Sequence, residues 1–168
     1  MALIAELLLV CSATEAEPQL QAMLNMALGT VLPLAQALDS TDTGVVFMFW
    51  RVGDERFKPL VTLSGGVVPP EKRQWYTDNA ARKLDALARN PEILSTFEVA
   101  DESIELFGGG VQLRKRVALI SAGLAPHFDE MLVCLMAYRA GLSTLEEVRG
   151  IAEISNNPHL RKYLERIS

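Results

Sequence analysis

The sequence has few of the residues that build metal centres and disulfide frameworks. It contains two histidines and two cysteines in 168 residues. Cys11 and Cys134 match no metal-ligand spacing, and no cluster of His, Cys or carboxylate residues accompanies the histidines, so we predict no metal site. Both cysteines lie in apolar runs, which favours small buried thiols in a reducing compartment. A disulfide between them stays open at this point.

An excess of basic residues is also missing. Lys and Arg number 16 against 21 Asp and Glu, which gives a formal net charge of −5 at pH 7. An acidic surface repels the phosphate backbone, so the composition argues against nucleic-acid binding. The dense basic cluster Arg114-Lys115-Arg116 is three residues long and is more typical of a strand end or turn than of a binding patch.

The N-terminal apolar run is too short to span a bilayer. It carries Glu6 and has no basic segment before it, unlike a secretory signal peptide. We therefore expect a cytoplasmic protein without a membrane partner. Apolar residues make up 49% and charged residues 22% of the chain, as in compact globular proteins, and the length favours one α+β domain over residues 1–168.

Four short apolar segments predict strands. Residues 45–52 are rich in β-branched and aromatic residues, and Gly53-Asp54 would turn the chain into a second strand over 57–63. Residues 111–113 and 117–121 are expected to form two more strands. The hairpin signal at the glycine favours antiparallel pairing.

Helices are expected before, between and after these strands. Thr14 is a candidate cap for the first, and Pro33 should kink or split it. The expected helices are 14–38, Pro70 to about Arg89, 126–140 (central, because it is apolar nearly all round), one capped by Ser143 to Glu146, and 159–167. The predicted fold class is α+β, an antiparallel sheet flanked by helices in a profilin- or PAS-like layer, with extra C-terminal helices. The wide apolar helices also predict a homo-oligomer.

The most informative stretch is the glycine triplet Gly108-Gly109-Gly110. Without Cβ atoms, this backbone can turn at positive φ or press against a ligand or another chain. It leads into a buried strand, a turn at Gly123 and an acidic helix start, an arrangement in which small modules tend to place a pocket. An ordinary bend between two strands would use the same residues, and the glycines alone favour that interpretation.

Three segments follow one another in a recognisable order. They are Tyr76-Thr77-Asp78-Asn79-Ala80-Ala81-Arg82-Lys83, then Leu106-Phe107-Gly108-Gly109-Gly110-Val111-Gln112-Leu113, then Leu119-Ile120-Ser121-Ala122-Gly123-Leu124 with Asp129-Glu130. In order and spacing they resemble the GlcG/HbpS-like family (the haem-degrading domain group) over about residues 44–140. The resemblance implies an antiparallel sheet flanked by helices, assembly into dimers or larger rings and, in some members, binding of haem or a corrinoid.

Several positions depart from the family's pattern. Gln112 stands where the family has the proline of Gly-Gly-Val-Pro, and Ala122 stands where it has the serine of a Ser-Gly turn. The connection at 114–116 is shorter than the family's hairpin, and the segment 141–168 lies beyond the family core. These departures favour a second hypothesis, an oligomeric adaptor that binds protein and no small molecule.

Six residues are candidates for a ligand site. Arg82 and Lys83 would pair with propionates or another anionic group, Arg by its planar fork and Lys as a point charge, although a solvated helix face would carry the same residues. His127, at a strand-to-helix turn, would ligate a metal or a tetrapyrrole iron from an open edge, although an ordinary histidine at a helix start would look the same. With Gly108, Gly109 and Gly110, these residues would form an edge that binds a small planar or anionic molecule.

No catalytic residues are predicted. The acidic residues of Asp101-Glu102 and of Asp129-Glu130 are adjacent and point in different directions, which is poor geometry for acid–base chemistry. Ser121 has no base evident from the sequence, and the triplet lacks the Lys-Ser/Thr of a phosphate loop. We therefore expect a non-catalytic small-molecule-binding module of GlcG/HbpS type, for haem, a related tetrapyrrole or another anionic ligand, with the adaptor as the alternative.

Overall fold

The computed structural model describes residues 13–37, 45–52, 56–113 and 116–167. Within these ranges the chain forms one antiparallel sheet, made of β1 (Val45–Val52), β2 (Arg56–Ser64), β3 (Gly110–Leu113) and β4 (Val117–Ala122). The order across the sheet is β2-β1-β4-β3, so the two hairpins join along the β1–β4 pair. The predicted α+β class and antiparallel sheet are confirmed.

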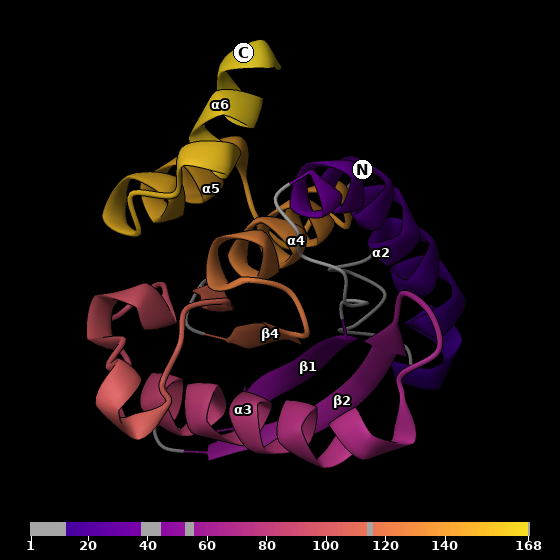
Figure 1. The fold of residues 1–168 in the computed structure, drawn as a ribbon, viewed down its shortest axis with the longest axis vertical. Coiled ribbons are helices and arrows are strands. Elements are labelled where there is room, and N and C mark those ends of the chain that lie inside the picture. Colours follow the sequence, from indigo (N-terminus) through magenta and orange to yellow (C-terminus); the bar gives the residue numbers. More distant parts are fainter. Residues whose placement is uncertain (1–12, 38–44, 53–55, 114–115, 168) are drawn as a thin grey trace.

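Helices cover both faces of the sheet (Figure 1). α2 (Ala13–Gln36) and α4 (Pro126–Arg139) lie on one face, and α3 (Pro70–Arg89) lies on the other. The short 3-10 helices η1 (Thr96–Val99) and η2 (Glu102–Ile104) connect α3 to β3. α5 (Leu145–Ile154) and α6 (Pro158–Arg166) continue beyond α4, on the side of the molecule away from α3.

Alternation along β1 gives the sheet two buried faces. Val46 and Met48 belong to the main core with α2 and α4, whereas Val45 and Phe47 pack with residues of α3. β4 is buried along its whole length, because it lies inside the sheet and helices cover it on both sides. β2 lies at an edge of the sheet, where Pro59 can be accommodated without the loss of an interior hydrogen bond.

α4 is the central helix of the fold. Every residue from Phe128 to Ala137 is buried, as its nearly all-apolar sequence predicts. Cys134 is a free thiol on this helix, and burial raises its pKa well above the usual value. The same buried stretch contains two carboxylates, Asp129 and Glu130, which must find polar partners inside the protein.

α2 differs from its predicted form. It begins at Ala13, so Thr14 lies in the first turn rather than at the cap. It also continues through Pro33 as one helix, and the predicted split is wrong. The proline ring approaches the carbonyl of the residue four positions earlier, which is Gly29, and a side chain there would meet only open space. This exposed carbonyl can tilt toward water without breaking the helix.

Some predicted features fall outside the described residues. These are the N-terminal apolar run, Cys11, the Gly53-Asp54 turn, and Arg114 and Lys115. In the part of the chain that the structure describes, none of the helices is both long enough and apolar enough to cross a membrane.

Candidate functional site

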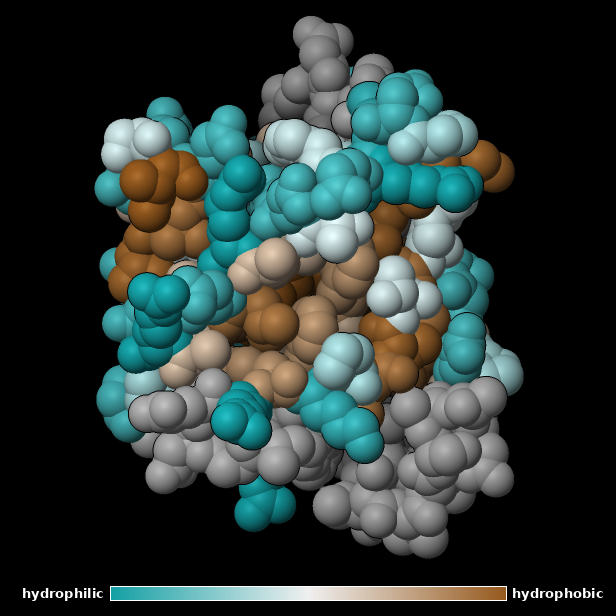
Figure 2. Space-filling view, turned by 90° about the horizontal axis from the view of Figure 1, so that it is seen from below, coloured by the Kyte–Doolittle hydropathy of each residue, from teal (hydrophilic) through white to brown (hydrophobic). Residues whose placement is uncertain are grey.

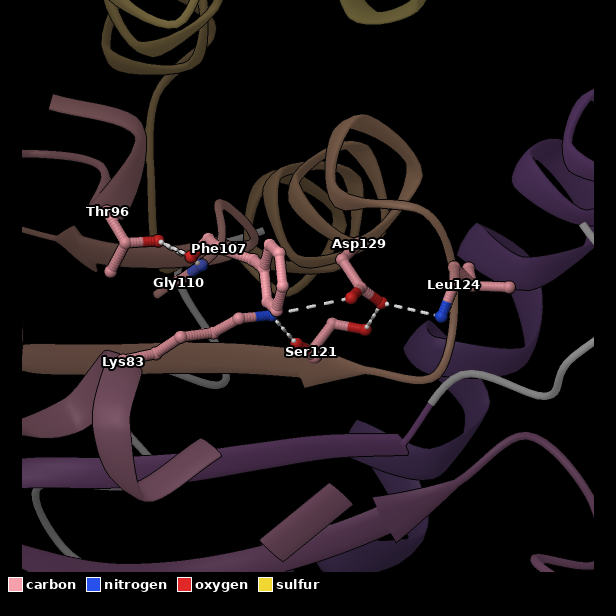
Figure 3. Close-up of polar contacts among 7 residues, drawn as sticks. All are labelled: Lys83, Thr96, Phe107, Gly110, Ser121, Leu124 and Asp129. Carbon is pink, nitrogen blue, oxygen red and sulfur yellow. Dashed lines mark hydrogen bonds and ion pairs between the residues drawn. The ribbon is translucent and has the colours of Figure 1, made fainter. Parts of the chain in front are cut away.

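A buried ion pair lies where α3, β4 and α4 meet. The Lys83 side chain of α3 and the Asp129 side chain of α4 have 1% and 4% of their surface exposed. Lys83 Nζ lies 3.4 Å from Asp129 Oδ2 and donates a 2.7 Å hydrogen bond to the carbonyl oxygen of Ser121 (Figure 3). Two charges are therefore held inside the protein with little access to water.

The carboxylate of Asp129 has further donors. The Ser121 hydroxyl donates to Oδ1 over 2.6 Å, and the Leu124 amide donates to the same oxygen over 3.2 Å (Figure 3). Burial raises the pKa of Asp129, while Lys83 and these hydrogen bonds oppose the rise. Burial lowers the pKa of Lys83, and Asp129 opposes that shift. Each partner thus offsets part of the other's cost of desolvation.

The glycine triplet leaves room for this ion pair. Gly109 has a φ of 105°, in the left-handed region that favours glycine. A Cβ atom on Gly109 would lie 2.5 Å from the Asp129 Cβ and 3.0 Å from Lys83 Nζ. Any side chain at this position would displace one of the two charged groups, so the absence of a Cβ is a steric requirement of the pair.

The flanking glycines also press against protein atoms. A Cβ on Gly108 would lie 2.1 Å from the ring of Phe97, and one on Gly110 would lie 3.0 Å from Cγ2 of Thr96. The Thr96 hydroxyl donates to the Phe107 carbonyl over 3.1 Å and accepts the Gly110 amide over 3.0 Å (Figure 3). The triplet is therefore fixed at both ends, and its close contacts are to the protein's own side chains.

The other two predicted site residues lie apart from the ion pair. The half-buried ring of His127 stacks on Phe97, with ring centroids 4.6 Å apart and an interplanar angle of 14°. His127 therefore connects to the triplet only through the Phe97 ring that faces Gly108. Arg82 lies on the outer side of α3, where its guanidinium is 3.0 Å from Glu105. The structure thus brings Lys83 and Gly109 together and leaves Arg82 outside.

The positions directly beside the triplet are occupied by the protein's own side chains. Phe97, Thr96 and Asp129 fill the positions next to the three glycines, and one face of the His127 ring is covered by Phe97. Among the described residues, no group of three or more His, Cys, Asp or Glu side chains is placed to hold a metal ion. Haem binding by these residues stays a prediction.

Glu130 is the centre of a second polar cluster that the sequence did not predict. Its buried carboxylate accepts hydrogen bonds from the Ser95 hydroxyl and the Ser155 hydroxyl, both over 2.5 Å, and from the Asn157 amide over 3.1 Å. Burial raises the pKa of Glu130, while these donors oppose the rise. The cluster joins η1 and the start of α6 to α4, so its geometry indicates a structural role. The one sequence signal for this cluster was a pair of adjacent acidic residues in an otherwise apolar helix.

Lys83, Asp129 and Ser121 are residue types that also occur in acid–base and nucleophilic sites. Here the Ser121 hydroxyl donates to a carboxylate, as an activated nucleophile would. All three residues are buried, with Ser121 at 0% exposure, so a substrate has no route to them in this structure. The arrangement can hold α3, β4 and α4 together.

An open groove lies elsewhere, between α3 and the β1–β2 hairpin. We call it the α3 groove and define it by the residues that line it: Val45, Phe47, Thr62, Ser64, Gly66, Val67, Val68, Arg73, Tyr76 and Thr77. Its volume is about 450 Å³, compared with about 300 Å³ for a hollow between α5 and α6 and about 270 Å³ for one between α3 and η2. Viewed from the α3 side, the molecule shows an apolar hollow bordered by hydrophilic residues (Figure 2).

Comparison with known proteins finds no match for this chain. No family model matches it, and no similar protein is found among curated proteins or solved structures. The GlcG/HbpS-like relationship stays a prediction, and function has to be inferred from the chain's own geometry.

Proposed function

We propose that this chain is a non-catalytic small-molecule-binding module whose ligand occupies the α3 groove. The observation that carries the proposal is the groove itself, a concave site of about 450 Å³ with an apolar floor. Pockets for small molecules usually have volumes of about 300–1,000 Å³ and are lined mainly by apolar and aromatic side chains, with few polar groups.

The floor of the groove is made by side chains that pack on one another. Val45, Tyr76 and Ala122 form a buried cluster, against which Phe47 and Val68 pack. Val67, at the rim, has 87% of its surface exposed. An apolar floor with an exposed valine beside it is a surface that gains free energy when an apolar molecule displaces water.

This proposal moves the binding site away from the residues that the sequence favoured. Lys83 and the glycine triplet fix α3 and α4 to the sheet, which is what the wall of a preformed pocket needs. A haem-like ligand is the class that the family resemblance implies. It is therefore one of the molecules to be titrated.

The neutral fluorescent dye Nile red tests the proposal. We expect a saturable rise in dye fluorescence with wild-type protein. Thr77→Trp, which adds bulk inside the groove, should weaken binding by about tenfold or more, since one large side chain is comparable to the ligand in size. Ala81→Trp, one turn further along α3 and outside the groove-lining residues, is the matched control and should bind the dye as wild type does. Dye binding that is absent, or that Thr77→Trp leaves unchanged, would refute the proposal.

A haem titration by absorbance, repeated on His127→Ala, distinguishes the two locations. A saturable Soret shift that His127→Ala abolishes would support iron ligation by His127 and would count against the α3 groove as the site. A shift that Thr77→Trp abolishes and His127→Ala leaves intact would support the groove.

One observation favours the second candidate function, an assembly or adaptor subunit. The outer side of α2 exposes Met26 at 55% and Leu34 at 40% of their surface. Such side chains on one helix favour contact with a second copy of the chain. Light scattering tests this hypothesis: a dimer or larger species that Met26→Glu with Leu34→Glu reduces to the monomer mass of 18.5 kDa would support it. A wild-type monomer across micromolar concentrations would contradict it.

A further inference from the structure

We infer that the α3 groove selects an amphipathic monocarboxylate, a molecule with an apolar body and one anionic head, and that the Arg73 guanidinium binds the head. This inference rests on the proposed function, because it specifies the ligand class of that same groove. It follows from the charges at the groove, from the hydroxyl groups around it, and from the shape of its floor.

Arg73 is the charged side chain among the described residues that line the groove, and none of these residues is a carboxylate. The chain as a whole has a net charge of −5, so this described lining, with one cation and no anion, differs in sign from the chain's overall charge. An anionic head is therefore attracted to this site rather than to the surrounding surface.

The guanidinium of Arg73 is also unused within the described part of the chain. Three other arginines have carboxylate partners: Arg82 pairs with Glu105, Arg89 with Asp85, and Arg161 with Glu153. No described carboxylate lies within ion-pair distance of Arg73, which is exposed at the rim. Its planar fork of N–H donors matches the two oxygens of a carboxylate, so it can form two parallel hydrogen bonds with one.

Two of the four hydroxyl groups that line the groove, those of Ser64 and Thr77, already donate their protons to the backbone. The Ser64 hydroxyl donates to the Gly66 carbonyl, and the Thr77 hydroxyl donates to the Arg73 carbonyl over 2.9 Å. Their protons are therefore already used, and the two oxygens can only accept. A ligand with several negative charges, such as a nucleotide, would need more cations than this groove offers.

The apolar floor determines that the rest of the ligand, beyond its anionic head, is apolar. Half-buried Phe47 and Val68 and exposed Val67 present aliphatic and aromatic surface without a charged group. Such a surface contributes free energy in proportion to the apolar area that leaves water, about 25 cal/mol per Å². A hydrocarbon chain or ring on the floor with its carboxylate at Arg73 satisfies both parts of the site.

Displacement of Nile red by three ligands of equal chain length tests the inference. The ligands are decanoate, decanol and decylammonium, each used below the concentration at which it aggregates. With wild-type protein, we expect decanoate to displace the dye at about tenfold lower concentration than decanol, which corresponds to about 1.4 kcal/mol, because a charge-assisted hydrogen bond is stronger than a neutral one. Decylammonium should be weaker than decanol, because it brings a second cation to Arg73.

Arg73→Gln removes the charge and keeps a polar side chain of similar shape. It should reduce decanoate affinity to that of decanol and leave the decanol and dye affinities unchanged. Arg73→Glu should reverse the order of decanoate and decylammonium. Arg89→Gln, which removes a cation from the far end of the same helix, is the matched control and should change none of the affinities.

The outcomes separate this inference from the proposed function. If the dye binds but decanoate and decanol compete equally, the inference is wrong and the binding module stands. If Arg73→Gln weakens decanol as much as decanoate, Arg73 only packs against the ligand, and the inference is again wrong. If wild-type protein binds neither the dye nor any of the three ligands, the proposed function itself fails.

Discussion

The replacement Lys83→Met tests whether the buried ion pair holds α3 to the rest of the fold. Methionine keeps the apolar stem and removes the ammonium group, so Asp129 and the Ser121 carbonyl lose their donor. Removing one partner of a buried pair costs about 3–5 kcal/mol. Because the Ser121 hydroxyl and the Leu124 amide still reach Asp129, we expect about 3 kcal/mol, near the lower limit.

A double-mutant cycle isolates the pair from other effects of the substitution. Asp129→Asn keeps an oxygen for the Ser121 and Leu124 donors and removes the negative charge. The double variant buries no charge, so it should be more stable than the sum of the single losses predicts, by about 1–3 kcal/mol. Urea denaturation followed by circular dichroism measures all four proteins. Arg89→Met, which breaks the exposed pair with Asp85, should cost under about 0.5 kcal/mol and serves as the control.

The pH dependence provides a second readout. Burial raises the pKa of Asp129, and Lys83 opposes this rise, so in Lys83→Met the pKa should rise further. In the variant, the protonated Asp129 carboxyl therefore stabilises the folded state. This contribution is complete below the ordinary pKa of 3.8 and is lost as the pH rises through the folded-state pKa. The loss in free energy of unfolding caused by Lys83→Met should thus grow from pH 4 toward neutrality. A deficit below about 1 kcal/mol at pH 7, or single losses that simply add, would refute this account of the pair.

Three further predictions concern other buried groups. Gly109→Ala should lower the free energy of unfolding, measured by urea denaturation, by about 2–5 kcal/mol, because of its positive φ and the clash with Asp129. Gly150→Ala, on α5 where a Cβ meets open space, should raise this free energy by up to about 1 kcal/mol. Because burial raises the Glu130 pKa, its contribution to stability should decline as the pH rises above the ordinary 4.5, and Glu130→Gln should flatten that part of the pH profile. Burial and the nearby His159 lower the His127 pKa, so thermal stability should fall as the pH drops through the ordinary 6.5, and unchanged pH dependence in His127→Asn would contradict this.

The helices and strands were predictable because turn and proline residues in the sequence mark where they begin and end. Pro69-Pro70 and Asn90-Pro91 enclose α3, which runs from Pro70 to Arg89 as predicted. The predicted strands agree with β1 to β4 to within one residue at each end, because turn residues and apolar runs mark their limits. The sequence left open whether Pro33 would kink α2 or split it. The outcome depends on Gly29, one turn earlier, where a side chain would meet only open space.

The role of Lys83 was harder to predict, because its partner lies 46 positions away. From sequence alone, Lys83 resembles its neighbour Arg82, and both were assigned to ligand binding. On a helix, however, adjacent residues point about 100° apart. Arg82 faces outward to Glu105, whereas Lys83 shares the inner face with Tyr76, Ala80 and Leu87. A lysine in an apolar stripe was the available signal, and it indicates a buried partner.

The α3 groove could not be predicted, because three separate segments form it and none carries a motif. β1 and β2 provide one wall, the loop before α3 provides the rim, and α3 provides the other wall. Their spacing depends on where α3 lies over the sheet, which no local pattern encodes. In the sequence, Arg73 resembles the other exposed cations of an amphipathic helix. Its position beside the apolar floor distinguishes it in the structure.

The two sites are connected through α3. Lys83 and Arg73 lie on the same 20-residue helix, one anchored to α4 through the ion pair and the other at the rim of the groove. The glycine triplet leaves room for the Lys83–Asp129 ion pair, which holds α3 in place, and α3 forms one wall of the groove. A wall that is fixed before the ligand arrives loses less conformational freedom on binding than one that must be ordered at that moment. The residues most informative in the sequence therefore position the groove that we propose as the ligand site, and the sequence alone does not show that groove.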